Sequence, residues 1–282
     1  MRLCVITDEI SQDLAHALDF CEDEGVSTIE LRAVHEANIV SHNDDSLEEI
    51  KAMIDGRGFR VGAIASPFLK CPLRGDGDPQ GAAHFAVPAS REEQWDILER
   101  SFEVARLFGA RIVRSFSFWR VPDPSGVRDE VAGVISEAAR RTGAAGLTLG
   151  LENEHACNVA TGAETRWVLD RATSPALGVI WDPGNEAAMG SEPFPGGYEQ
   201  VRGRVVHVHL KDMDVDGNWT RMGAGVIDYA GQFRALARDG YDGFLSLETH
   251  YELPKGGAEK ATRESLAAIR DLGEEAGIRL RD

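Results

Sequence analysis

Short, strongly apolar runs alternate with amphipathic stretches from one end of the chain to the other. Each run is rich in Val, Ile or Leu and is bounded by Gly, Pro or polar residues, as strands buried on both faces of a parallel sheet are. The eight predicted strands are Leu3–Thr7, Thr28–Leu31, Arg60–Ala65, Arg111–Ser115, Thr148–Glu152, Leu177–Trp181, Val205–Leu210 and Phe244–Glu248.

The segments between these strands predict helices. Leu14, Leu18 and Cys21 recur at helical spacing before Gly25, and similar patterns precede Gly56 and Gly109. Three helix starts have the capping-box form: Ser46-x-x-Glu49, Ser90-x-x-Glu93 and Thr161-x-x-Glu164. Further helices are predicted near Val127–Arg141, Tyr229–Arg238 and Glu259–Glu275, whereas the segment after the sixth strand predicts little more than a turn near Tyr198–Arg202.

Eight β/α units in series, with no linker and no shift in composition, indicate an α/β protein built as one closed (β/α)8 barrel over residues 1–282. The alternative is a doubly wound open sheet. That fold would carry a G-x-G-x-x-G phosphate loop after its first strand, and none is found there.

Three connections are long: Ser66–Ala89, Pro183–Gly203 and Lys211–Asp228. They follow the predicted strands three, six and seven, so they lie on the same face of the barrel. Long loops usually carry function, and this face holds the active site in barrels of this type.

The last four strands each end in a side chain that binds metal ions. These side chains are Glu152, Asp182, His209 and Glu248. Three carboxylates crowded at one level repel one another unless a cation lies between them. Three oxygen donors and one imidazole suit Mn²⁺, Mg²⁺ or Co²⁺, with Zn²⁺ and Fe²⁺ as alternatives. His209 is preferred over His207, which we expect deeper in the core.

The order of these motifs resembles the sugar isomerase/epimerase group of xylose-isomerase-like TIM barrels. The matching segments are L-E-N-x-H, W-D-x-x-N, H-V-H-L-K-D, G-x-G-x-I-D and the final L-E. The resemblance implies that Glu152, Asp182, His209 and Glu248 bind one divalent metal ion and that Glu152 and Glu248 are the catalytic acid/base pair. In the ketose 3-epimerases of this group, a substrate-binding His occupies the position of Asn185 and a Glu that of Asn158.

Five residues near the strand ends are predicted to contact substrate: His155, Asn185, Lys211, Arg114 and Ser66. Each has a structural alternative. Arg114 can form a salt bridge with Glu152, Asp212 can neutralise Lys211, and His155 can be a surface residue. For Ser66, and for Glu30 and Arg32 at the end of the second strand, the expectation is a structural role at the rim of the barrel. Trp119 and Trp181 are expected in the core rather than stacked on a sugar.

Composition narrows the choice of partner. The chain has 47 acidic and 30 basic residues, a net charge of −17, and no basic patch, so we expect no binding to nucleic acid or anionic lipid. Its four cysteines are scattered and predict reduced thiols. No membrane span or signal peptide is evident, which predicts a cytoplasmic protein. Exposed helix faces leave a homo-oligomer open.

The chemistry expected of such a site is proton transfer next to a carbonyl. A metal that binds the carbonyl oxygen stabilises an enediolate, while one glutamate takes the proton and the other returns it. A metal-dependent sugar isomerase or epimerase acting on a keto-sugar is therefore predicted. The alternative is a lyase or dehydratase acting on an inosose or keto-glycoside through the same enolate. A DNA-repair nuclease on this fold would need a trinuclear zinc cluster, with several extra histidines at the strand ends, and a basic face; the net charge of −17 and the presence of only 8 histidines argue against it. A non-catalytic sugar-binding subunit would not need both glutamates.

Overall fold

Eight parallel strands close into a barrel in this computed structural model, which describes residues 1–75, 85–251, 253 and 257–281. The strand order around the barrel is β1-β12-β9-β8-β7-β6-β5-β2. The barrel strands are β1 (Arg2–Ile6), β2 (Thr28–Leu31), β5 (Arg60–Ile64), β6 (Ile112–Ser115), β7 (Thr148–Glu152), β8 (Leu177–Trp181), β9 (Val205–Leu210) and β12 (Phe244–Leu247). The predicted closed barrel is confirmed, and each predicted strand lies within a residue of the observed one at either end.

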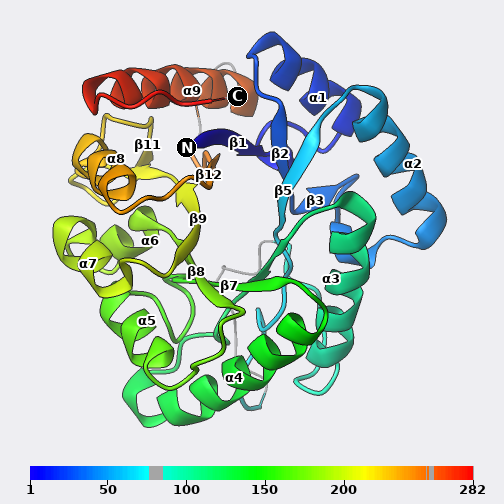
Figure 1. Ribbon diagram of the computed structural model, residues 1–282, viewed down its shortest axis with the longest axis vertical. Helices are drawn as coiled ribbons and strands as arrows, with labels where there is room; N and C mark the ends of the chain where they lie inside the picture. The colour runs from blue at the N-terminus through cyan, green and yellow to red at the C-terminus, as the bar shows by residue number, and fades with distance from the viewer. Residues whose placement is uncertain (76–84, 252, 254–256, 282) are drawn as a thin grey trace.

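Helices lie outside this ring of strands, with α9 beside α1 where the chain closes the circle (Figure 1). The α-helices among the described residues are α1 (Leu14–Asp23), α2 (Asp44–Gly56), α3 (Gln94–Phe108), α4 (Arg128–Ala144), α5 (Gly162–Leu169), α6 (Pro183–Ala188), α7 (Tyr198–Val201), α8 (Tyr229–Arg238) and α9 (Gly257–Glu275). Their buried faces are apolar: in α1, for example, Leu14, Leu18 and Cys21 all point into the core. The helix predicted after the sixth strand is indeed short, since α7 has four residues, but α6 was not predicted.

Two of the three predicted capping boxes form. The Thr161 hydroxyl accepts the Glu164 amide while the Glu164 carboxylate accepts the Thr161 amide at the start of α5. Ser90 and Glu93 exchange the same pair of bonds just before α3. The third prediction is wrong. At α2 the cap is Asn43, whose side chain accepts the Ser46 amide, because the helix begins two residues before Ser46.

The long connections lie on the face where the barrel strands end. Residues 76–84 of the first predicted loop lie outside the described residues. The connection after β8 contains α6, the helical turn η4 (Pro193–Gly197) and α7. The connection after β9 forms a hairpin of β10 (Asp212–Met213) and β11 (Trp219–Thr220). A smaller hairpin, β3 (Ala33–Val34) with β4 (Ala37–Asn38), follows β2.

Two register shifts interrupt the regular pairing of the barrel. One lies between Ile29 and Glu30 where β2 pairs with β5, and the other lies between Val179 and Ile180 where β8 pairs with β9. Gly178 makes the second possible, because a Cβ there would lie 2.3 Å from Val206 Cγ1. Such irregularities change the direction in which nearby side chains point, and both occur beside residues of the candidate site.

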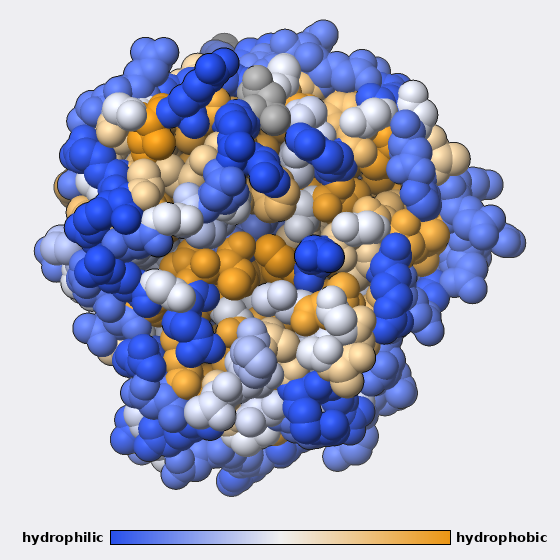
Figure 2. Space-filling model, in the orientation of Figure 1, coloured by the Kyte–Doolittle hydropathy of each residue, from blue (hydrophilic) through white to orange (hydrophobic). Residues whose placement is uncertain are grey.

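Polar residues cover the helices around the edge of the face shown in Figure 2, and hydrophobic residues gather towards its middle. This is the distribution that an outer layer of amphipathic helices produces. Among the described helices none is long and apolar enough to span a membrane. All four cysteines are free and buried, which agrees with the expectation of unpaired thiols.

Candidate metal centre

The structure brings together the four predicted metal ligands. Glu152 is the last residue of β7, His209 lies near the end of β9, and Asp182 and Glu248 directly follow β8 and β12. One ligand atom from each lies within 4.8 Å of the others, and each of the four residues is at most 4% exposed. Two ligands on opposite sides of an ion at about 2.2 Å are about 4.4 Å apart, so the group has the dimensions of one coordination sphere.

His209 lies among the carboxylates. Its Nδ1 is 3.1 Å from Glu152 Oε1 and 3.9 Å from Glu248 Oε2. Burial lowers the pKa of this imidazole, but Glu30 and Glu152 raise it by more, so its pKa lies well above the ordinary value. In the absence of a metal, His209 therefore serves as a cation between the acids.

Lys211 supplies a second positive charge at the same place. Its Nζ lies 2.8 Å from Glu248 Oε2 and 2.9 Å from Asp182 Oδ2, and the side chain is 1% exposed. Burial, with Glu248 and Glu152 also contributing, raises the pKa of Asp182 to about 6 despite Lys211. Asp212 does not neutralise Lys211: its carboxylate accepts the amides of Met213, Gly223 and Gly225 and so holds the late loop.

Arg114 forms the salt bridge that was the structural alternative for this residue. Its Nη1 lies 3.2 Å from Glu152 Oε2, and its other nitrogens donate to the carbonyls of Ala65 and Ser66. Burial raises the pKa of Glu152, but His209 and Arg114 outweigh this effect and hold it below the ordinary value. Arg114 therefore keeps Glu152 ionised, and a contact with substrate stays a prediction.

Arg32 is not a rim residue, contrary to expectation. Its guanidinium is 3% exposed and contacts the carboxylates of Asp8, Glu9 and Glu248. The bond from Nη1 to Glu248 Oε1 is 2.6 Å long. Arg32 and Lys211 therefore hold the two oxygens of Glu248 from two directions.

His155 and Asn185 form a pair next to the cluster. His155 Nδ1 is 2.7 Å from Asn185 Oδ1 and 2.8 Å from Glu154 Oε1, while Asn185 Nδ2 donates to Glu152 Oε1 at 3.4 Å. Burial lowers the pKa of His155, and the Glu154 carboxylate more than reverses this, so its pKa is raised. The imidazole is partly exposed and therefore remains accessible to a substrate.

Three other residues considered in the sequence, Ser66, Trp119 and Trp181, have structural contacts or lie in the core. Ser66 Oγ is 2.7 Å from Ser101 Oγ and accepts the Phe68 amide, so its role as a substrate contact stays a prediction. Trp181 is fully buried and donates to Gln232 Oε1, and Trp119 is 7% exposed, as expected for core residues.

Trp219 was not among the predicted site residues. It lies in β11, and its ring centroid is 6.1 Å from that of His155 and 5.8 Å from that of His250. Lys211 Nζ lies 5.5 Å from the centre of the Trp219 ring. The indole therefore lies next to the cluster between the ends of β7 and β12. The only hint in the sequence is its place in a long loop on the functional face.

The charges fit a cation at the cluster. The connected carboxylates are Asp8, Glu9, Glu30, Glu152, Asp182 and Glu248. The cations paired with them are Arg32, Arg114, Lys211 and, without a metal, His209, so the carboxylates are still in excess. Asp182 Oδ2 is buried and has an ion-pair contact but no hydrogen bond. An excess of buried carboxylates, one of them with an oxygen that accepts no hydrogen bond, matches the oxygen-rich donor set of a divalent metal site.

Comparison with known families agrees with this geometry. The family model described as Xylose isomerase-like TIM barrel matches residues 18–272. The chain belongs to this family, which the fold and the cluster of Glu, Asp and His side chains had already indicated. Comparison with curated proteins gives no match.

Solved structures with the same fold share little sequence with the chain. The L-ribulose 3-epimerase structure is 19% identical, with a TM-score of 0.73 over 98% of this chain and 95% of that one. The probable 3-DHS dehydratase AsbF from Bacillus anthracis is 17% identical, with a TM-score of 0.74 over 96% and 99%. The IOLI protein, solved with a zinc atom, is 18% identical, with a TM-score of 0.73 over 98% and 99%. The chain also spans 43% of a fusion of such a barrel with 4-hydroxyphenylpyruvate dioxygenase, at 18% identity and a TM-score of 0.76 over 98% of this chain.

Proposed function

We propose that the protein is a divalent-metal-dependent sugar isomerase or epimerase that moves a proton next to the carbonyl of a keto-sugar. The observation that carries this proposal is the buried group of Glu152, Asp182, His209 and Glu248, whose ligand atoms all lie within 4.8 Å of one another. An epimerase with this fold is among the structural neighbours, which supports the same chemistry.

The metal supplies positive charge that stabilises the negative charge developing on the substrate oxygen. Mn²⁺, Mg²⁺ and Co²⁺ are our first choices because three of the four donors are carboxylate oxygens; the zinc atom in the IOLI structure keeps Zn²⁺ open.

Glu152 and Glu248 are the proposed acid and base. They approach the cluster from β7 and from the end of β12, with β8 and β9 between these strands in the barrel. Burial raises the pKa of Glu248, but Lys211, His250 and Arg32 outweigh it and leave its pKa well below the ordinary value. Both glutamates are therefore ionised in the free protein at neutral pH. One removes the proton from carbon. The other first takes up a proton from solvent and then delivers it to the opposite side of the carbon, which inverts the centre.

The neighbouring polar groups are proposed to bind the sugar hydroxyls. His155 and Asn185 lie beside Glu152, and the Lys211 ammonium lies beside Glu248. A sugar hydroxyl can replace the contact of Asn185 with Glu152 or of Lys211 with Glu248, because a hydroxyl both donates and accepts hydrogen bonds and so leaves no buried charge without a partner.

Deuterium exchange tests the proposal directly. The protein, reconstituted with Mn²⁺, is incubated in D2O with keto-sugars, inososes and 3-keto-glycosides, and the products are followed by NMR. We expect deuterium at the carbon next to the carbonyl of at least one substrate, and its loss in Glu152→Gln and Glu248→Gln. The exposed Glu192→Gln is the matched control. Exchange that survives in Glu248→Gln, or that is absent from every substrate, contradicts the proposal.

A dehydratase is the second candidate, because the probable dehydratase AsbF shares this fold and because Lys211 places a proton donor beside Glu248. The same enolate would then expel a β-hydroxyl group as water, with the proton coming from a buried acid. A product that absorbs as an enone, with loss of the mass of water, favours the dehydratase over the isomerase.

A further inference from the structure

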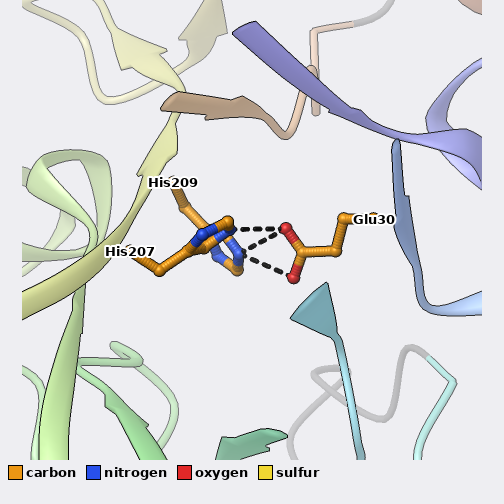
Figure 3. Close-up of side chains that lie close together, drawn as sticks. All are labelled: Glu30, His207 and His209. Carbon is orange, nitrogen blue, oxygen red and sulfur yellow. Dashed lines mark hydrogen bonds and ion pairs between the residues drawn. The ribbon is translucent and has the colours of Figure 1, made fainter. Parts of the chain in front are cut away.

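Glu30 lies inside the barrel, below the metal centre rather than at its rim. It is the third residue of β2 and is fully buried. Figure 3 shows its carboxylate facing two imidazoles that project from β9 across the barrel. Its Oε2 is 2.8 Å from His207 Nε2, and its two oxygens are 3.1 and 3.2 Å from His209 Nε2.

The barrel is shaped to allow this contact. The register shift next to Glu30 in β2 and the shift opposite His207 in β9 occur where these side chains meet. Ser246 of β12 donates a third hydrogen bond to Glu30 Oε2, at 2.6 Å. Side chains from two strands, β9 and β12, thus hold the carboxylate that β2 supplies.

The direction of these hydrogen bonds determines the tautomer of His209. An ionised carboxylate only accepts, so the Nε2 atoms of both imidazoles must carry hydrogen. His207, His209 and Ser246 all direct a possible donor at the two oxygens of Glu30, which is the arrangement expected around a carboxylate that accepts every one of these bonds. When neutral, His209 then has its lone pair on Nδ1, the atom that faces Glu152 at 3.1 Å.

We propose that Glu30 is a positioning residue that keeps the hydrogen of His209 on Nε2 and so presents Nδ1 to the ion held by Glu152, Asp182 and Glu248. The inference rests on the proposed metal centre. Carboxylates that accept a hydrogen bond from a metal-binding histidine typically improve metal affinity 10- to 100-fold.

The surroundings of His207 explain why replacing Glu30 by Gln should move the ring hydrogen of His209 rather than that of His207. His207 Nδ1 is buried and has no hydrogen-bond partner among the described residues, so hydrogen on that atom would be an unsatisfied donor. A Gln at position 30 offers one acceptor and one donor, and the donor must face a nitrogen without hydrogen. His209 can meet this need, because its Nδ1–H can donate to Glu152 Oε1.

The test is Glu30→Gln, with metal affinity and histidine tautomer as readouts. Isothermal titration with Mn²⁺ should give one site in the wild type and a 10- to 100-fold weaker one in the variant. Two-bond ¹⁵N–¹H spectra of the metal-free wild type should show hydrogen on His209 Nε2, and also on Nδ1 because the metal-free imidazole is a cation. The spectra of the variant should show hydrogen on Nδ1 alone. Ser246→Ala, which leaves both imidazole contacts in place, should bind Mn²⁺ within about threefold of the wild type.

Each outcome has one meaning. Unchanged affinity and tautomer in Glu30→Gln overturn the inference while leaving the metal centre intact. Two Mn²⁺ ions in the wild type and one in the variant also overturn it, by making Glu30, His207 and His209 a second metal site. If the wild type binds no Mn²⁺, the proposed function fails, and the spectra still test the assignment of Glu30. If Glu30→Gln does not fold, Glu30→Asp keeps the charge but shortens the side chain, and it should weaken Mn²⁺ binding.

Discussion

Lys211 Nζ lies 2.8 Å from Glu248 Oε2, so a buried ammonium already occupies the neighbourhood of the proposed metal ligands. The same nitrogen is 2.9 Å from Asp182 Oδ2. Lys211 therefore stabilises the metal-free barrel by compensating two carboxylates that would otherwise be buried without a counter-ion. A metal ion bound at the proposed centre would share these carboxylates with Lys211.

Replacing Lys211 separates these two effects. Lys211→Met should destabilise the metal-free protein by roughly 3–5 kcal/mol, because it leaves buried carboxylates unpaired. It should also increase the stabilisation by Mn²⁺, since the ion no longer shares its ligands with an ammonium. Urea unfolding with and without Mn²⁺ measures both effects. Lys260→Met, at an exposed position of α9, is the control. Equal losses in the two variants would contradict this role for Lys211.

Trp219 should contribute to substrate binding but not to metal binding. The ring lies beside His155, His250 and Lys211, and an indole face binds the C–H face of a sugar ring. Trp219→Ala should raise KM by about tenfold, the factor that corresponds to about 1.4 kcal/mol, and leave kcat and Mn²⁺ affinity near wild type. Trp219→Phe should restore most of the loss. A fall in Mn²⁺ affinity in Trp219→Ala would show that the residue instead supports the metal centre.

Glu186 should make stability depend on pH near neutrality. Burial raises the pKa of its carboxyl from 4.5 to about 7, even though Oε2 accepts the Gly162 amide. Between these two values the folded state binds a proton that the unfolded state does not, so stability falls as pH rises.

Glu186→Gln removes this titrating carboxyl group. The difference in unfolding free energy between the variant and the wild type should therefore shift in favour of the variant by about 2 kcal/mol as the pH rises from about 5 to about 8. Urea unfolding at the two pH values checks this, with the exposed Glu48→Gln as control. A constant difference between Glu186→Gln and the wild type would rule out the raised pKa.

Gly178 should be intolerant of a side chain. A Cβ there would lie 2.3 Å from Val206 Cγ1, within the barrel and next to the shifted register of β8 and β9. We expect Gly178→Ala to lower the free energy of unfolding by about 1–3 kcal/mol. The exposed Gly133 in α4 has open space around it, so Gly133→Ala should instead stabilise the protein by up to about 1 kcal/mol. Thermal or urea unfolding of the two variants shows whether a loss of stability in Gly178→Ala comes from the steric clash with Val206 or from replacing glycine by alanine in general.

The sequence by itself was sufficient for the barrel and the four proposed ligands. Strands buried on both faces must be apolar throughout, so they are recognisable without knowledge of their neighbours. Glu152, Asp182, His209 and Glu248 each occur where such a run ends, and successive parallel strands end on the same face. The capping box of Thr161 was equally local, because both of its partners lie within three residues.

Only the tertiary structure decided which charges meet. Glu30 contacts His209 across 179 residues, and Arg32 contacts Glu248 across 216. These pairs depend on how the barrel closes and on two register shifts, which no local pattern records. Trp219 reaches the centre only because the connection after β9 folds into a hairpin. Local sequence specifies which residues are buried and where strands end, whereas the partner of a buried charge depends on packing between strands that are distant in the chain.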